Sequence, residues 1–258
     1  FLADVCEFLY TLRPELLSSL NFVIIERFDD LQEQQKKYFE ESFGDVVKLT
    51  HYKSLSELQC KSAFFIANEI FDAFPCELYF KGDTARVDGH AINFDLKDDW
   101  VSEKAAKYHK EKGEIAVGYE EFAKEMAASA EQFEFMSFDY GEMQARPDFS
   151  LRIYAKHEVY PFFEDNLDRE ELFGTSDITY DVTFEHVKDA YAEAGVKFIE
   201  CVPQMVSLVD MGILELMEML QKNADEKIYK QELEKVKILI MPNLMGERFK
   251  MIKFRKIS

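Results

Sequence analysis

One predicted strand ends by placing two acids and an amide close together. The segment "FFIANEIFDAFP" (64–75) begins with four apolar residues, which predict a buried strand, and continues with Asn68, Glu69 and Asp72. Asn and Asp also cap helices, so a short helix beginning here is the alternative. On such a turn Glu69 and Asp72, at i and i+3, would face the same way. Two carboxylates and an amide above a buried strand can hold a cationic group, and we favour this functional interpretation.

Two further predicted strands end on acids. Glu26 ends the run "NFVIIE", and Asp139 follows an apolar run and precedes Tyr140 and Gly141. Ligands of open parallel sheets bind beyond the carboxyl ends of the strands, where an acid commonly accepts ribose hydroxyls. For Glu26, a solvated carboxylate or a cap for the next helix is an equal alternative. For Asp139, a turn residue before Gly141 is the alternative.

The elements that must position these residues alternate between strands and helices. Predicted strands span 21–26, 46–50, 63–68, 133–141, 196–202 and 248–257. Predicted helices span 1–13, 30–44, 118–133 and 185–195, and two more lie between 203 and 235. Asp30 with Glu33 predicts a capping box for the second helix, and Gly44 its end. This alternation predicts an α/β fold with a parallel sheet.

Residues 77–112 interrupt the alternation. They predict a hairpin with Gly-Asp at its turn and a charged, mobile helix, together forming an insertion over the sheet. We therefore divide the chain into part of the core (1–76), an insertion or lid (77–117) and the remaining core with helical additions (118–258).

Three other segments carry weaker signals. Residues 142–176 predict mostly loop, and 177–184 a strand or the approach to a helix. The Leu/Met-rich helices from 203 to 222 could form the face of a homodimer, although core packing is the favoured use of such a stripe.

The charge, the cysteines and the apolar runs of the chain limit its expected partners and location. The chain of 258 residues has 50 acidic and 31 basic residues, a net charge of −19, which disfavours nucleic acid and favours basic proteins or peptides as partners. Four cysteines without C-x-x-C spacing predict reduced, buried thiols and a cytoplasmic protein. No apolar run reaches the length of a membrane helix, so membrane insertion is not expected.

Several kinds of catalysis lack a sequence signal. No pair of histidines has metal-ligand spacing, and His157 and His186 are interpreted as structural. Nucleophile elbows and glycine-rich phosphate loops are absent from the sequence. We therefore expect neither a metal site nor covalent catalysis.

The segment "NEIFDAFP" resembles the signature of the MidA-like family of S-adenosylmethionine (SAM)-dependent methyltransferases. Five further segments resemble family motifs in the same order: "FVIIERFDDLQEQQ" (22–35), "SFDYGE" (137–142), "LRIYAKHEV" (151–159), "SDITYDVTF" (176–184) and "MGERFKMIKF" (245–254). Mitochondrial members of this family are complex I assembly factors that methylate an arginine of a partner subunit.

The resemblance implies a class I methyltransferase fold, Rossmann-like and mostly parallel with an antiparallel last strand. It implies that SAM is the cofactor, that Glu26 binds its ribose hydroxyls, and that Asn68 and Glu69 line the place where the methyl group is presented. Methyl transfer is an in-line displacement, so the protein mainly aligns donor and nucleophile. Glu69, Asp72 and Asp139 are then expected to form an acidic wall that orients a guanidinium of a protein substrate.

The sequence departs from the family pattern in two places. The glycine-rich loop expected before residue 1 is absent, so either the sequence is truncated or the loop has been lost. The loop "THYKSL" lacks a Trp expected in many relatives, which leaves the adenine contact open. A non-catalytic assembly protein and a methyltransferase for a small molecule bound under the insertion are therefore the alternatives.

Overall fold

The computed structural model describes residues 1–88, 91–156, 158–164, 167–172 and 174–257, so His157 lies outside the described residues. The chain forms two compact units. The first contains residues 1–61 and 128–131, and the second 62–127 and 132–258. The division at residues 76 and 117 stays a prediction.

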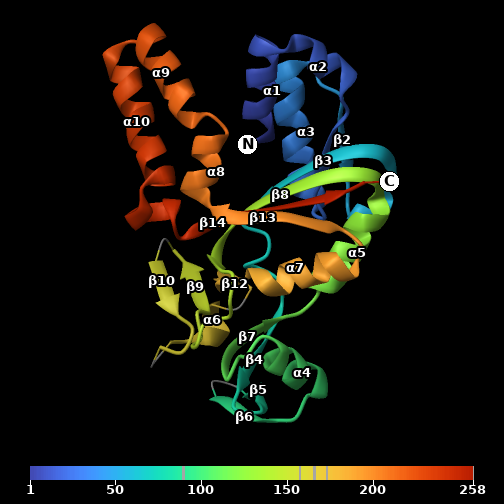
Figure 1. The fold of residues 1–258 in the computed structure, drawn as a ribbon, viewed down its shortest axis with the longest axis vertical. Coiled ribbons are helices and arrows are strands. Elements are labelled where there is room, and N and C mark those ends of the chain that lie inside the picture. Colours follow the sequence, from blue (N-terminus) through green and yellow to red (C-terminus); the bar gives the residue numbers. More distant parts are fainter. Residues whose placement is uncertain (89–90, 157, 165–166, 173, 258) are drawn as a thin grey trace. The chain divides into compact units, whose positions relative to one another are not determined.

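The first unit packs helices on two parallel strands. Its elements are α1 (Leu2–Leu12), α2 (Pro14–Ser19), β1 (Phe22–Ile25), α3 (Asp29–Phe43), β2 (Leu49–Tyr52) and the short helix η1 (Leu55–Glu57) (Figure 1). Strands β1 and β2 pair with Phe22 opposite Leu49. The core of this unit contains Ala3, Cys6, Leu17, Phe22, Phe39 and Val47.

Two details of this unit differ from expectation. The strand predicted at 46–50 begins only at Leu49, because Val47 enters the core from a turn. The capping box is wrong, since Asp30 lies inside the first turn of α3 and Phe28 is the N-cap residue. Gly44 ends α3 as predicted, with a φ of 53°.

The second unit contains a mixed sheet. Its strands are β3 (Cys60–Asn68), β8 (Ala130–Glu142), β12 (Val182–Thr183), β13 (Lys197–Pro203) and β14 (Phe249–Lys256), in the order β12-β8-β14-β13 with β3 also on β8. Strand β12 is parallel to β8, whereas β14 is antiparallel to β8 and β13. The α/β fold and the antiparallel last strand are thus confirmed. The finer class I description stays a prediction.

Helices α5 (Tyr119–Ser129) and α7 (Phe184–Glu193) accompany this sheet (Figure 1). Tyr191 of α7 stacks on Phe254 of β14 with ring centroids 4.1 Å apart, and both rings contact Phe135 of β8. The predicted buried strand at 63–68 is wrong in part, because Phe64 is 60% exposed. Since β3 alternates, its neighbour Phe65 packs instead against Phe133.

The predicted insertion is a small packed sheet with a helix. It contains β4 (Cys76–Phe80), β5 (Asp83–Asp88), β6 (Ala91–Leu96), α4 (Asp99–Lys107) and β7 (Lys112–Ala116), all labelled in Figure 1. The strand order is β6-β5-β4-β7. The hairpin turn is Lys81-Gly82, one residue earlier than predicted, because both residues adopt the positive φ of a two-residue turn. Helix α4 is packed, not mobile, since Val101 and Ala105 are fully buried.

The segment predicted to be mostly loop contains regular structure. Strands β9 (Arg152–Ala155), β10 (Glu158–Pro161) and β11 (Asp177–Thr179) form an antiparallel sheet in the order β10-β9-β11, with helix α6 at Arg169–Leu172. The alternating residues Leu151, Ile153 and Ala155 are buried, which explains why β9 forms.

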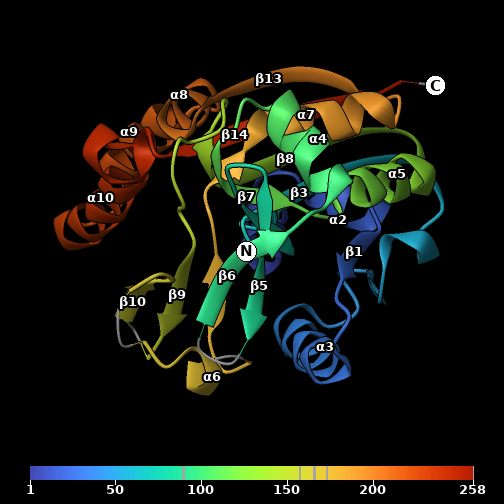
Figure 2. The ribbon, with the colours of Figure 1, turned by 90° about the horizontal axis from the view of Figure 1, so that it is seen from below.

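Three helices, not two, follow β13. They are α8 (Gln204–Asp210), α9 (Ile213–Asn223) and α10 (Glu226–Ile240), followed by the turn of helix η2 (Pro242–Gly246). Gly212, with a φ of 91°, separates α8 from α9. Helices α9 and α10 lie side by side in Figures 1 and 2. In the Leu/Met-rich stretch from 203 to 222, α8 buries only the polar residues Gln204 and Ser207 and α9 buries none, so the expected core packing of this stripe is wrong. Within the described chain, no helix is long and apolar enough to cross a membrane.

Candidate functional site

The turn after β3 presents Asn68 and Glu69 to solvent. Both side chains are exposed, and the Asn68 amide donates a hydrogen bond of 2.8 Å to Oε1 of Glu69. Glu69 has a φ of 50°, which is uncommon for a residue with a side chain. Its N–H donates to the Phe138 carbonyl at 2.8 Å. Strained backbone of this kind persists only where the surroundings fix it, and it points to function.

Asp139 is the residue that fixes this turn. Its side chain is fully buried, and Oδ2 accepts hydrogen bonds from the N–H groups of Ile70 (3.1 Å) and Phe71 (2.8 Å). Its Oδ1 accepts the N–H of Tyr140 at 2.9 Å. The expected exposed position of Asp139 in an acidic wall is therefore not what the structure shows. Asp139 holds the two residues that follow Glu69.

Asp72 lies inside the same turn. It is 3% exposed, and its Oδ2 accepts a hydrogen bond from the Tyr140 hydroxyl. Oδ1 of Asp72 has no hydrogen-bond partner. Residues 71–74 form a turn and not a helix, so Glu69 points outward while Asp72 points inward. The expectation that they face the same way is wrong, although the charge of Glu69 still raises the pKa of Asp72.

Burial raises the pKa of both inner carboxyls. Loss of hydration and, secondly, the charge of Asp72 raise the pKa of Asp139 to about 8. Loss of hydration is also the largest cause that raises the pKa of Asp72, against the hydrogen bond from Tyr140. Both oxygens of Asp139 accept N–H donors, whereas one oxygen of Asp72 is unpartnered. Both carboxyls bind a proton more readily than an exposed acid does.

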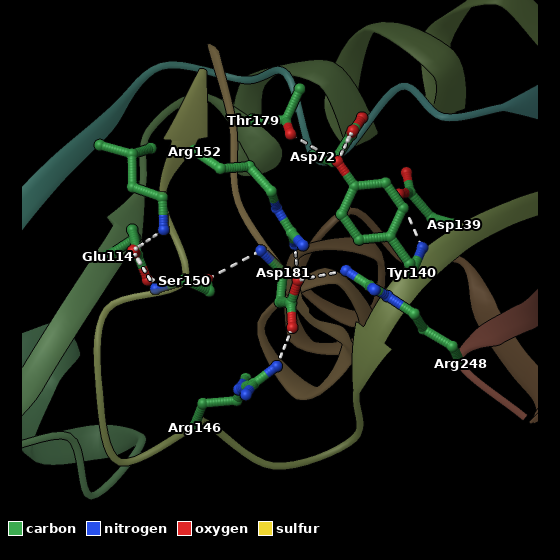
Figure 3. A network of polar contacts seen from close by, with 11 residues as sticks. Asp72, Glu114, Asp139, Tyr140, Arg146, Ser150, Arg152, Thr179, Asp181 and Arg248 are labelled. Atoms are coloured by element: carbon green, nitrogen blue, oxygen red, sulfur yellow. Dashed lines mark hydrogen bonds and ion pairs between the residues drawn. The ribbon is translucent and has the colours of Figure 1, made fainter. Parts of the chain in front are cut away.

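Three arginines converge on Asp181 beside this pair (Figure 3). Asp181 is buried and forms ion pairs with Arg146 and Arg152, and Nη2 of Arg248 lies 3.9 Å from its Oδ1. The guanidinium carbons of Arg152 and Arg248 lie 5.0 and 5.6 Å from the centroid of the Tyr140 ring. Tyr140 thus links the arginines to Asp72.

Glu114 holds the loop that leads into β9, which begins at Arg152. It is buried, and its carboxylate accepts the N–H groups of Ser150 (2.7 Å) and Leu151 (2.8 Å) (Figure 3). The Ser150 hydroxyl in turn accepts the N–H of Asp181 at 2.9 Å. The arginine cluster therefore rests on a buried carboxylate from β7.

Five of the six segments that resemble family motifs meet in this network. The motif at 68–75 contributes Asp72, and the motif at 137–142 contributes Asp139 and Tyr140. The motif at 176–184 contributes Asp181 and Thr179, whose hydroxyl lies 2.6 Å from that of Tyr140. The motifs at 151–159 and 245–254 contribute Arg152 and Arg248. The prediction of site residues missed Arg146, Arg152, Thr179, Asp181 and Arg248. The motifs that contain four of these five were the available signal.

Glu26 belongs to the first unit and is described there alone. Its Oε1 accepts the N–H of Phe28 at 3.0 Å, the N-cap residue of α3. This contact lies in the turn before α3 and is not a side-chain cap of the helix, so the role of Glu26 stays a prediction. Its Oε2 accepts no hydrogen bond from the described residues, so it remains available for the predicted ribose contact.

A second buried polar cluster contains none of the predicted site residues. Glu120 accepts hydrogen bonds from Lys104 and, at 2.9 Å, from His186. Burial alone would raise the pKa of Glu120, but these two hydrogen bonds outweigh it and lower the pKa to about 2. His186 also lines a cavity of about 10 Å³ with Tyr119 and Tyr180, which holds no more than about one water. This cavity is too small for a substrate under the insertion.

Comparisons with known proteins agree with this fold. A family described as "Putative S-adenosyl-L-methionine-dependent methyltransferase" matches residues 1–202. The chain is 33% identical over 113 residues to the mitochondrial protein arginine methyltransferase NDUFAF7 of Xenopus laevis, which covers 43% of this chain and 24% of that protein. It is 24% identical over 220 residues to the protein of the same name from Rattus norvegicus, covering 79% of this chain and 48% of the relative.

Two solved structures from Burkholderia thailandensis share the fold at 19% identity. One has a TM-score of 0.75 and covers 91% of this chain and 66% of its own. The other, solved bound to S-adenosyl-homocysteine, has a TM-score of 0.73 and covers 91% of this chain and 63% of its own. The chain spans half or less of the length of the curated relatives that it matches. Since the family match spans most of the 258 residues, the chain belongs to this family of S-adenosylmethionine-dependent methyltransferases.

Proposed function

We propose that this protein transfers a methyl group from SAM to an arginine side chain of a protein. The observation that carries the proposal is the turn after β3, where buried Asp139 holds a strained backbone that presents Asn68 and Glu69 at the surface. Family membership supports SAM as the methyl donor. The relatives named as protein arginine methyltransferases support arginine as the acceptor.

In each unit taken by itself, the residues present suit a part of the cofactor. Glu26 retains one carboxylate oxygen without a partner in the described chain, which suits a ribose hydroxyl. Asn68 and Glu69 expose amide and carboxylate oxygens at a strand end. When bound, SAM supplies an electrophilic methyl group on a sulfonium.

In this proposal, the side chain of Glu69 orients the acceptor. A carboxylate matches the paired N–H groups of a guanidinium, and it can accept the proton that the guanidinium loses. The hydrogen bond from Asn68 fixes the rotation of this carboxylate. Asp139, Asp72 and Tyr140 act as positioning residues, since they are buried behind the turn.

The test is methyl transfer from radiolabelled SAM to arginine-containing proteins, with methylarginine identified after hydrolysis. Glu69→Gln keeps the size of the side chain and the hydrogen bond from Asn68 but removes the charge, so we expect transfer to fall by about 100-fold. Glu121→Gln, an exposed acid of α5, is the matched control and should retain activity. Full activity of Glu69→Gln would refute the role of Glu69.

Calorimetric titration of SAM separates the proposal from its alternatives. It should be made on this chain and on any longer natural form of it. SAM binding with methylation of a protein supports the proposal. Absence of binding in both forms would favour a non-catalytic assembly protein. The proposed protein substrate leaves the location open, because the named relatives are mitochondrial and a cytoplasmic location stays a prediction.

A further inference from the structure

The arginine cluster carries more positive charge than its carboxylate offsets. Asp181, whose side chain is 5% exposed, faces three guanidinium groups, those of Arg146, Arg152 and Arg248. One carboxylate against three guanidinium groups leaves two positive charges. In a chain with a net charge of −19, this local surplus is unusual.

Two of the three arginines can be reached from solvent. The side chains of Arg146 and Arg248 are each 53% exposed, whereas that of Arg152 is 15% exposed. Among the described residues, no carboxylate other than Asp181 lies within ion-pair distance of Arg146 or Arg248. Asp148 feels the charge of Arg146, but it is paired with Lys112 at 2.7 Å.

The geometry of Arg248 leaves donors for a ligand. Its guanidinium lies over Tyr140, 5.6 Å from the ring centroid, and approaches Asp181 only to 3.9 Å. A guanidinium that stacks on a ring keeps N–H groups in its plane, and these match the two oxygens of a carboxylate.

We infer that Arg146 and Arg248 bind a carboxylate of the acceptor protein, an Asp or Glu side chain close to the methylated arginine. This inference rests on the proposed function, because it assumes that Glu69 orients the acceptor arginine. The same buried network supports both places: Asp139 holds the turn of Glu69, and its neighbour Tyr140 contacts Arg248. An acidic acceptor would be repelled by the protein as a whole, so it needs such a local positive site.

The test measures binding without SAM. The probes are a fluorescent peptide with one arginine flanked by aspartates and the same peptide with asparagine in place of each aspartate. We expect the acidic peptide to bind more tightly by about tenfold and to lose this advantage at high salt. Arg248→Gln should reduce the advantage about three- to tenfold, Arg248→Lys should restore part of it, and Arg86→Gln, which alters an exposed arginine paired with Asp95, should not change it.

The outcomes distinguish the inferred carboxylate site from the proposed methyl transfer. Equal binding of the two peptides overturns the inference and leaves methyl transfer untouched. Preference for the acidic peptide without methylation supports the site and counts against the proposed function. If Arg248→Gln weakens SAM binding but not peptide discrimination, the carboxylate bound is that of the cofactor, and the acceptor site is refuted.

Discussion

The buried pair of Asp72 and Asp139 should make this protein less stable as the pH rises. The folded-state pKa of each carboxyl is raised, so the folded protein binds a proton that the unfolded chain releases near its ordinary pKa of about 3.9. The stabilisation is therefore fully present below about pH 4 and is lost as the pH rises through the folded-state pKa, which is about 8 for Asp139.

The size of the effect follows from the shift. One pKa unit corresponds to about 1.4 kcal/mol, so a rise from about 3.9 to about 8 sets an upper limit of roughly 6 kcal/mol, and relaxation of the site should reduce the observed loss to about 2–3 kcal/mol. Burial is the larger cause and the charge of Asp72 the second. Removing that charge should therefore recover only part of the loss, about 1 kcal/mol.

The substitution to make is Asp72→Asn. Asparagine resembles the protonated carboxyl, and its side-chain oxygen can still accept the hydrogen bond from Tyr140. We expect the variant to match the wild-type protein in stability at pH 5 and to exceed it by about 1 kcal/mol at pH 8. The assay is urea unfolding followed by circular dichroism between pH 5 and 8.5.

Two controls identify the source of the pH dependence. Asp45→Asn alters an exposed acid and should give a profile parallel to that of the wild-type protein. Asp139→Asn should cost at least about 2 kcal/mol at every pH, because its amide would face at least one N–H donor. Parallel profiles for Asp72→Asn and the wild-type protein would refute the contribution of the Asp72 charge to the raised pKa of Asp139.

Three other expectations test packing and association. Gly141→Ala should lower stability by more than about 3 kcal/mol in thermal unfolding, because an added Cβ would lie 2.1 Å from the Val182 carbonyl oxygen; Gly44→Ala, strained by its φ but in open space, should cost only about 1 kcal/mol. Glu120→Gln should cost about 2–3 kcal/mol at pH 7, because the loss of the carboxylate charge weakens its contacts with Lys104 and His186, and the difference should narrow as the pH falls below 4. If the exposed stripe of α9 forms the proposed homodimer, sedimentation should show dimers that Met219→Glu dissociates; a monomeric wild-type protein would refute it.

The elements predicted best are those with long periodic patterns. Helix α3 and strands β13 and β14 extend over enough residues for the apolar period to be visible. Strands β9, β10 and β11 have four residues or fewer, so their alternation is hidden among turn residues, and the segment resembles a loop.

The candidate site was predicted in its residue types but not in its depth. Asn68, Glu69, Asp72 and Asp139 do gather around one strand end. A sequence cannot distinguish an exposed acid from one that is buried by contacts far along the chain. The buried Asp139 accepts hydrogen bonds from the N–H groups of Ile70 and Phe71, which precede it by 69 and 68 positions. Nothing near Asp139 in the sequence indicates these contacts.

The structure gives the acids and the amide of the motif at 64–75 different surroundings. Asn68 and Glu69 are exposed whereas Asp72 is buried, so the two acids do not form one exposed surface. Glu69 is exposed and faces outward, while Asp72 lies with Asp139 behind the turn, where burial raises the pKa of both carboxyls. A second exposed carboxylate would compete for the acceptor guanidinium, whereas a buried one supports the turn without adding a carboxylate at the surface. We therefore interpret Glu69 as the binding group of the motif and Asp72 as its support. The positive charge of Arg146 and Arg248 complements the negative charge of Glu69, as an acceptor with both an arginine and a carboxylate requires.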